Sequence, residues 1–342
     1  MIRFDYQRPD DIATATQAAH VGAAPLPQVR FLAGGTNLIV LIKENVERPT
    51  TVIDINRLPL GKIESLPDGG LRLGALATNA DTAQHADVKA RYPLLASAIL
   101  AGASPQLRNA ATNGGNLNQR TRCYYFYDPA TPCNKREPGT GCGAIAGVNR
   151  IHAILGTSSD CIATHPSDMC VALAALDAVV NVSGPDGERQ IPFADYHRLP
   201  GDEPWRDNTL QQGELVTSVD LPQGDFSGHY TYLKLRDRLS YAFALVSVAV
   251  ALKIEGGKLA DVRIALGGVA HKPWRVPAAE ALLNGQAASP ELFDQAAARI
   301  LDGAVGQGTN DFKIELARRA IARALAQAVA GKPQSQTDKR IA

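Results

Sequence analysis

Thr112-Asn113-Gly114-Gly115-Asn116 opens the stretch of sequence that decides the fold, and Thr164-His165-Pro166-Ser167-Asp168 closes it. Between these two motifs lie four of the five cysteines of the chain. The residues around the cysteines are aromatic, basic and rich in Gly and Pro, and few of them are aliphatic. Because such a composition has little apolar content to build a core, the stretch is predicted to be a loop that is inserted into a folded domain and held by something other than packing.

The four cysteines of this stretch are Cys123, Cys133, Cys142 and Cys161, separated by nine, eight and eighteen residues. None of these intervals is the short C-x-x-C spacing of a zinc ribbon. An odd number of cysteines in a long chain does not fit a small secreted disulfide scaffold either. Four thiolates can still bind zinc or an iron–sulfur cluster, whose charge nearby basic residues would offset. The alternatives are disulfides or cysteines without a role. The basic residues nearby in sequence are Arg120, Arg122, Lys135 and Arg136.

The fifth cysteine, Cys170, differs from the other four. It lies within Met169–Leu173, in a helix predicted to begin at Pro166 or Ser167 and to run through Leu176. The helix is apolar on all sides, so Cys170 is expected to be a small core residue. Asp168 stands at the start of this helix, where capping alone could explain it.

A second glycine turn precedes the first in the chain. Residues 29–32 are predicted to form a strand, Ala33-Gly34-Gly35-Thr36-Asn37 a turn, and residues 38–45 a helix. Glycines let successive N–H groups face one point, and a helix N-terminus adds partial positive charge, so the turn suits a diphosphate. The alternative is an ordinary strand–helix turn. The turn at 112–116 has the same character, and the Thr112 hydroxyl and Asn116 amide could donate to a phosphate or to the edge of a ring.

The rest of the chain divides into two parts. Residues 29–182 are predicted to be a mixed α/β body, and residues 183–222 to be turn-rich. A domain boundary is placed near residues 222–228. Beyond it, strands at 229–235, 242–254 and 259–266 and helices at 278–283, 290–301 and 311–330 predict an antiparallel sheet backed by helices.

Bulk composition excludes several classes of protein. The chain has 342 residues, 45% hydrophobic and 20% charged, with a net charge of +1, which gives no indication of nucleic-acid binding. No apolar run approaches the roughly 20 residues of a transmembrane helix, and the N-terminal residues lack the apolar core of a signal peptide. A folded chain of this kind could still cross a membrane as part of a complex whose partner carries the signal.

These segments together resemble the FAD-binding subunits of the molybdenum hydroxylases, the family of xanthine dehydrogenase and carbon monoxide dehydrogenase. The segments are Arg30–Leu38, Thr112–Leu117, Ile162–Asp168 and Lys234–Arg238. The likeness covers about residues 1–330. It is closest to the FAD and [4Fe–4S] subunits of the bacterial periplasmic aldehyde oxidoreductases. The segments that make it so are Gln119–Cys123, Pro132–Arg136, Cys161–Met169 and Leu266–Arg275.

The resemblance implies an α+β fold. A two-part FAD-binding domain of the vanillyl-alcohol-oxidase (PCMH) type would occupy residues 1–224, with an iron–sulfur insert at about 119–161. A smaller α+β domain of the carbon monoxide dehydrogenase flavoprotein type, an antiparallel sheet with helices, would follow at 225–330. Residues 331–342 are expected to form a disordered tail.

The resemblance also implies two cofactors, FAD and a [4Fe–4S] cluster. The residues implied for FAD are Arg30, Phe31, Leu32, Ala33, Gly34, Gly35, Thr36, Asn37, Leu38, Thr112, Gly115, Asn116, Asp168 and Lys234. His165 is a further candidate, as a flavin neighbour or a plain turn residue. Lys234 belongs to a charge run that is either a solvated strand edge or a source of a cation for the cofactor. The residues implied for the cluster are Cys123, Cys133, Cys142 and Cys161. No catalytic acid, base or nucleophile is expected.

The function implied is that of the FAD-containing electron-transfer subunit of a molybdenum-dependent aldehyde oxidoreductase. In such a heterotrimer, a molybdopterin-containing large subunit oxidises the substrate. A small subunit with two [2Fe–2S] clusters passes electrons to FAD, from which an external acceptor takes them. The alternatives are a stand-alone FAD oxidase and a non-catalytic iron–sulfur scaffold. The expected location is the periplasm, reached with a signal-bearing partner, and the alternative is the cytoplasm.

Overall fold

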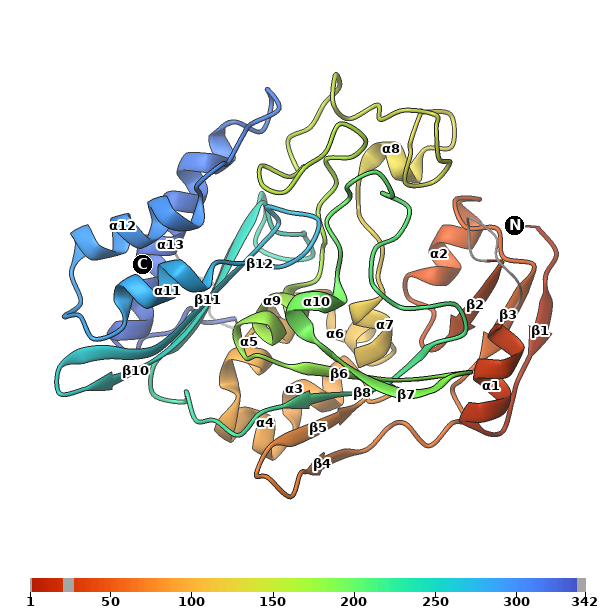
Figure 1. Ribbon diagram of the computed structural model, residues 1–342, viewed down its shortest axis with the longest axis horizontal. Coiled ribbons are helices and arrows are strands. Elements are labelled where there is room, and N and C mark those ends of the chain that lie inside the picture. The colour runs from red at the N-terminus through yellow and green to blue at the C-terminus, as the bar shows by residue number, and fades with distance from the viewer. Residues whose placement is uncertain (1, 21–27, 337–342) are drawn as a thin grey trace.

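The computed structural model describes residues 2–20 and 28–336, which form three sheets (Figure 1). The first sheet is parallel, in the order β1–β3–β2, and α1 and α2 lie beside it. Its elements are β1 (Asp5–Gln7), α1 (Ile12–Ala19), β2 (Val29–Leu32), α2 (Leu38–Lys43) and β3 (Thr51–Asp54). A parallel pair needs a crossover connection, and the α2 segment provides it between β2 and β3.

The second sheet is antiparallel and has the order β4–β5–β8–β6–β7. Its strands are β4 (Ile63–Ser65), β5 (Leu71–Gly74), β6 (Val179–Gly184), β7 (Gly187–Pro192) and β8 (Leu215–Leu221). The helices of this part are α3 (Asn79–Gln84), α4 (Ala86–Arg91), α5 (Pro93–Ala101), α6 (Pro105–Arg108), α7 (Asn113–Leu117), α9 (Asp168–Ala175) and α10 (Phe193–Tyr196). The two sheets give the first domain its two parts, as the sequence predicts.

Helix α9 is the central helix of the molecule. The Ser167 hydroxyl caps it by accepting a hydrogen bond from the N–H of Cys170 at 3.0 Å, and every residue of the helix is buried. It packs against α5 on one side and against β10 and β11 of the C-terminal domain on another. A helix that is apolar all round belongs inside a protein, and α9 lies where the two domains meet (Figure 1).

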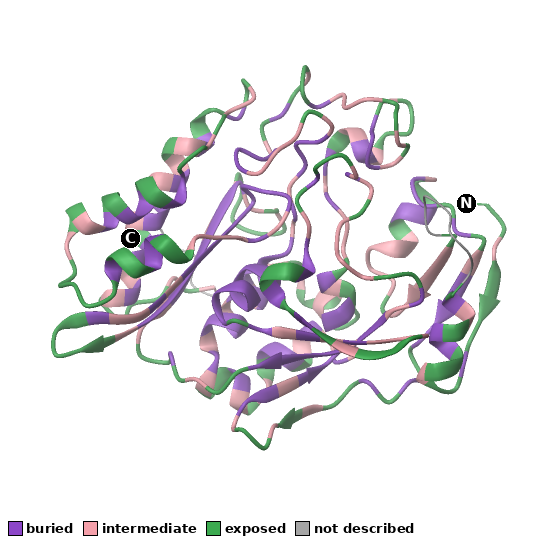
Figure 2. Cartoon of the chain, in the orientation of Figure 1, coloured by how far each residue is buried: buried purple, intermediate pink, exposed green. Residues whose placement is uncertain are grey.

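The third sheet and three helices form the C-terminal domain. The sheet is antiparallel, in the order β12–β11–β10–β9, with strands β9 (Tyr230–Leu235), β10 (Val246–Glu255), β11 (Lys258–Gly267) and β12 (Trp274–Arg275). Gly256 and Gly257 join β10 to β11 with φ of +57° and +77°, as a tight hairpin requires. The helices of this domain are α11 (Pro277–Leu283), α12 (Pro290–Ile300) and α13 (Phe312–Val329). They pack their apolar faces against one side of the sheet, and their opposite, polar faces are exposed to solvent (Figure 2).

The cysteine-rich insert contains little regular structure. Between α7 and α9 it has one short helix, α8 (Tyr124–Tyr127), and a single antiparallel bridge that pairs Cys133 with Cys142. In Figure 1 this segment rises above the body as a set of loops. The predicted loop insertion is confirmed.

The structure corrects three expectations. Residues 183–222 contain the expected turns, such as those at 185–186 and 201–202, but they also hold β7 and β8, and β8 is the middle strand of its sheet. The strand expected from residue 242 begins at Val246. The tail is ordered further than expected, since the Gln334 N–H donates to the Thr231 hydroxyl at 3.0 Å; residues 337–342 lie outside the described residues. Within the described residues, no helix is long and apolar enough to cross a lipid bilayer.

Candidate functional site

The first glycine turn, residues 33–37, packs directly against the segment that leads into the second. A Cβ atom on Gly34 would lie 1.8 Å from the carbonyl oxygen of Ala110, so only glycine fits there. Gly35 has a φ of +69°, which also favours glycine. The Asn37 Oδ1 accepts a hydrogen bond from the Arg120 N–H at 2.9 Å, which ties the turn to the start of the insert. The two turns, far apart in sequence, are neighbours in space.

This turn presents free hydrogen-bond donors. The backbone N–H groups of Gly34, Gly35, Thr36 and Asn37 donate to no acceptor among the described residues. Successive free N–H groups at the start of a helix form a concave site for an anion such as a phosphate. The Arg30 side chain is engaged in an ion pair with Glu47 at 2.6 Å, so the free donors of the turn are those of the backbone.

The second turn, residues 112–116, uses its donors inside the protein. The N–H groups of Asn113 and Gly114 donate to Ala77 and Ala75, and those of Gly115 and Asn116 donate to Thr112. The two turns therefore differ in character, contrary to the sequence-based expectation. The Asn116 side chain is also engaged: its Nδ2 donates to the Asn79 Oδ1 at 2.6 Å, and its Oδ1 accepts from the Ser167 hydroxyl at 2.6 Å.

Asp168 and Lys234 come together as a buried ion pair. The Lys234 ammonium from β9 lies 2.8 Å from the Asp168 carboxylate, and the two side chains are 3% and 8% exposed. Tyr232 donates its hydroxyl to the same carboxylate at 2.7 Å, and burial, together with Asp168, raises the pKa of Tyr232 well above its usual value. The cation of the C-terminal domain thus does reach the first domain, and the solvated-edge alternative for Lys234 is wrong.

His165 and Cys170 lie in a compact buried group with His197. Donor atoms of the three residues lie within 4.8 Å of one another, and burial, reinforced by His197, lowers the pKa of His165 well below its usual value. The His165 Nδ1 accepts a hydrogen bond from the Ser167 N–H at 3.4 Å, so the proton of the neutral ring lies on Nε2. Neither ring nitrogen of His165 then has a free lone pair for a metal ion. Cys170 is fully buried in the core, as its helix predicts.

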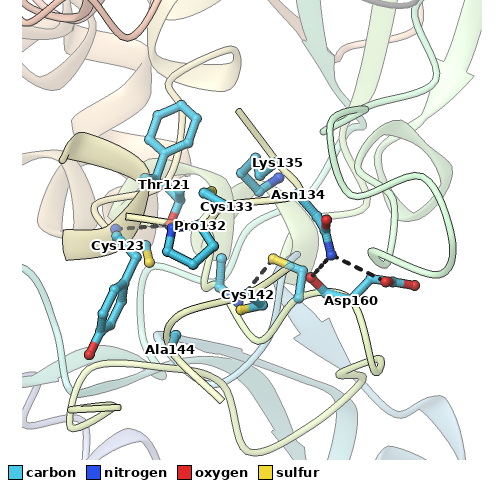
Figure 3. A pocket seen from close by; sticks show the side chains of 13 residues that line it. Thr121, Cys123, Pro132, Cys133, Asn134, Lys135, Cys142, Ala144 and Asp160 are labelled. Atoms are coloured by element: carbon cyan, nitrogen blue, oxygen red, sulfur yellow. Dashed lines mark hydrogen bonds between the residues drawn. The ribbon is translucent and has the colours of Figure 1, made fainter. Parts of the chain in front are cut away.

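The other four cysteines surround one pocket (Figure 3). Cys123 precedes α8, Cys133 and Cys142 face each other across the bridge, and the Cys161 Sγ accepts from the Ala163 N–H at 3.4 Å. All five cysteines of the chain are free thiols here, so the disulfide alternative is not supported. Four cysteines far apart in sequence are therefore brought to one place.

The sulfur atoms of the four cysteines are spaced more widely than the ligands of a bound zinc ion. Four thiolates around a single zinc ion, with Zn–S bonds of about 2.3 Å, would lie roughly 3.8 Å apart. In this well-described part of the chain, no three of the four sulfur atoms lie within 4.8 Å of one another. Burial raises the pKa of Cys123 to about 12 and that of Cys161 to about 11, with the nearby Lys135 ammonium partly offsetting the second shift. Such thiols ionise only when a metal takes the proton's place.

A chain of five charged side chains, the charge network, lies between the pocket and the first glycine turn. Glu47 pairs with Arg30 and Arg120, and Asp207 pairs with Arg120 at 2.7 Å and with Lys135 at 2.6 Å. Burial alone would raise the pKa of Glu47, but the two arginines outweigh it and lower that pKa to about 2. Burial also opposes ionisation of Asp207, yet Lys135 and Arg120 hold its pKa well below the usual range.

Sequence reasoning did not identify Glu47 and Asp207. Each is a single carboxylate in a segment without a motif. Arg120 is 73 residues from Glu47 and 87 from Asp207, and Lys135 is 72 residues from Asp207, so only the fold brings these charges together. The signal that was available was the run of basic residues beside the cysteines, since buried cations need anionic partners.

Comparison with known proteins places the chain in a family. Residues 2–224 match the model of the FAD binding domain in molybdopterin dehydrogenase, and residues 230–328 match that of the CO dehydrogenase flavoprotein C-terminal domain. The chain belongs to this family of FAD-binding subunits. It is therefore part of an oxidoreductase and FAD is its cofactor, which confirms the resemblance.

Individual relatives agree with this assignment. The chain is 49% identical to the aldehyde oxidoreductase FAD-binding subunit of Escherichia coli, over 96% of this chain and 99% of that one. It is 29% identical to the glyceraldehyde dehydrogenase medium chain of Sulfolobus acidocaldarius, over 79% of each chain. A solved carbon monoxide dehydrogenase from Hydrogenophaga pseudoflava superposes with a TM-score of 0.75 at 26% identity, over 97% of this chain and 99% of that one.

The geometry of the first glycine turn is compatible with FAD. The free N–H groups at 34–37 suit a diphosphate, and Gly34 leaves no room for a side chain between this turn and Ala110. Asp168, Lys234 and Asn116 are each held by hydrogen bonds to protein neighbours in this structure.

We predict that Gly34→Ala weakens FAD binding at least tenfold. The new methyl group must push the turn away from Ala110 and misalign the free N–H groups. FAD released from purified protein by denaturation, counted per chain, measures the effect. Gly61→Ala is the matched control, because a Cβ there meets nothing within 4 Å. Full FAD content in Gly34→Ala would contradict the prediction.

We also predict that Asp207→Asn destabilises the fold by about 3 kcal/mol, because it leaves the buried Lys135 and Arg120 cations without one of their anions. The shift of the urea unfolding midpoint measures this. Asp202→Asn, an exposed carboxylate in the same loop, should stay within about 0.5 kcal/mol of the unsubstituted protein. Equal effects of the two substitutions would show that the network contributes little.

Proposed function

We propose that this chain is the FAD-containing electron-transfer subunit of a molybdenum-dependent aldehyde oxidoreductase. It would accept electrons from an iron–sulfur partner subunit and deliver them to an external acceptor. The observation that carries this proposal is the 49% identity, over nearly the full length of both chains, to an FAD-binding subunit of an aldehyde oxidoreductase. The partners proposed are a molybdopterin-containing large subunit and a small subunit with two [2Fe–2S] clusters.

The residues of the chain bind and orient, and they carry out no acid–base chemistry of their own. When bound, FAD supplies chemistry that accepts and releases electrons. The turn at 33–37 offers main-chain donors for its diphosphate, and the Asp168–Lys234 pair fixes charge beside α9. Both members of that pair are already hydrogen-bonded, which suits positioning better than proton transfer. This agrees with electron transfer, which needs no general base.

We further propose that Cys123, Cys133, Cys142 and Cys161 hold a [4Fe–4S] cluster. Two features support this: all four line one pocket, and none of them is in a disulfide. The charge network also supports it, because three cations and two carboxylates leave one positive charge beside ligands that would be negative. When present, such a cluster supplies four metal–thiolate bonds that hold the loops together.

A structural role is favoured for this cluster over an electron-relaying one. The described insert has one short helix, one bridge and a small hydrophobic cluster, so bonds from four distant cysteines to one group would add to a limited core. A metal that stabilises a small loop-rich unit typically contributes folding energy outright.

The location proposed is the periplasm, reached in a folded complex whose partner carries the export signal. The alternative is the cytoplasm. Fractionation of the native host, followed by an immunoblot for this chain, distinguishes the two.

Purification of the complex from its native host tests the functional proposal. We expect the chain to copurify with two partners, one larger and one smaller than itself. The complex should contain FAD, iron, labile sulfide and molybdopterin. Oxidation of a substrate by the isolated chain would instead support a stand-alone FAD oxidase. A chain that contains iron but no FAD would support a non-catalytic scaffold.

We predict that Cys133→Ser reduces the iron content of the chain by at least half, whereas Cys170→Ser leaves it unchanged. Cys133 lines the pocket, and Cys170 is enclosed in the core away from it. Iron and labile sulfide per chain measure the difference. Loss of iron in Cys170→Ser, with full iron in Cys133→Ser, would show that the proposed set of ligands is wrong.

A further inference from the structure

The side chain of His152 contacts one of the four cysteines. Its Nε2 lies 3.0 Å from the Sγ of Cys123, and both residues are buried. The contact joins two parts of the insert that are 29 residues apart in sequence.

The C-terminal domain holds this imidazole in place. The carbonyl oxygen of His152 accepts from the Lys313 ammonium at 2.7 Å and from the Asn310 amide at 3.2 Å. Lys313 lies in the first turn of α13 and is itself fully buried. The rings of Tyr124 and Tyr125 flank the imidazole, with centroids 6.3 and 6.2 Å away. The C-terminal domain therefore holds the backbone of His152, and two tyrosine rings pack beside its imidazole.

The position of the ring proton follows from the contacts. The Nδ1 of His152 is buried and has no hydrogen-bond partner among the described residues. A proton on Nδ1 would leave a donor unsatisfied and would place the lone pairs of Nε2 and a thiolate sulfur against each other. A proton on Nε2 avoids both costs, since a ligating thiolate can only accept.

We propose that His152 is a positioning residue that donates its Nε2–H to the Cys123 sulfur and thereby raises the reduction potential of the group bound by the four cysteines. The inference rests on the proposed iron–sulfur cluster. A hydrogen bond to a ligand sulfur stabilises the more negative, reduced form, and such bonds are among the main determinants of cluster potentials. Because Lys313 and Asn310 hold the backbone of His152, the C-terminal domain sets this bond.

Two substitutions at the same position test the hydrogen bond. His152→Leu removes the donor, and His152→Gln places an amide N–H close to the position of Nε2. A redox titration of the whole purified chain, followed by electron paramagnetic resonance of the reduced cluster, gives the midpoint potential. His152→Leu is expected to make one-electron reduction about tenfold less favourable, which is about 59 mV for one electron, while His152→Gln stays near the unsubstituted value.

His229→Gln is the matched control, because His229 bonds to the Ala328 carbonyl in the C-terminal domain and not to a cysteine. It should leave the potential unchanged. An unchanged potential in His152→Leu with full iron would overturn the inference. So would equal shifts in His152→Leu and His152→Gln, which would point to packing alone.

A second measurement needs no folded variant. In protein labelled with ¹⁵N-histidine, pulsed electron paramagnetic resonance of the reduced cluster should detect one weakly coupled nitrogen across the hydrogen bond. Absence of this coupling in a protein with full iron and labile sulfide would overturn the inference about His152 but not the proposed cluster. Absence of iron and sulfide from the unsubstituted protein would overturn the proposed cluster and, with it, this inference.

Discussion

Two carboxylates, Glu47 and Asp207, are the constraint on which the arrangement of the site depends. Each is shared by two cations, and together they connect the strand before the first glycine turn, the start of the insert and the loop that ends at β8. A largely buried network of this kind is costly to leave incomplete, because removing one partner leaves a charge without compensation. The first glycine turn and the cysteine pocket are therefore joined through one set of ion pairs.

The insert is held at both of its ends, by different domains. At its beginning, Arg120 enters the charge network and donates its N–H to Asn37 in the glycine turn. At its end, Asn149 exchanges hydrogen bonds with Thr309, and His152 and Ala153 accept from Asn310. Between these anchors the chain has almost no regular structure. The anchored ends and a small hydrophobic cluster, in which Phe126 and Ile162 pack with Cys123, Cys133 and Cys161, bring the four cysteines together.

Much of the fold could be predicted from the sequence because it depends on local patterns. The strand at 29–32, the hairpin at Gly256–Gly257 and the helix after Ser167 each carry a local signal and are found where expected. Strand β8 was missed because its segment lies among turn residues, and its pairing partners β5 and β6 are distant in sequence. The network carboxylates were missed for the same reason, since only tertiary packing gives them partners. The difference between the two glycine turns also depends on tertiary contacts, which use the donors of one turn and leave those of the other free.

The charge network supports both the cysteine pocket and the first glycine turn. The positive charge left in the network lies beside the cysteines, where Lys135 is 1% exposed and donates to Asp207 and to the Pro204 carbonyl. A buried ammonium in that position favours negative ligands. Its connection to Glu47 and the first glycine turn runs through the ion pairs of Asp207 and Arg120. A change of charge at the cysteines would thus alter the ion pairs of Lys135 with Asp207 and of Asp207 with Arg120. Arg120 in turn contacts the turn that carries Asn37. Coupling of this kind needs no electron path between the two sites, since the shared charges are sufficient.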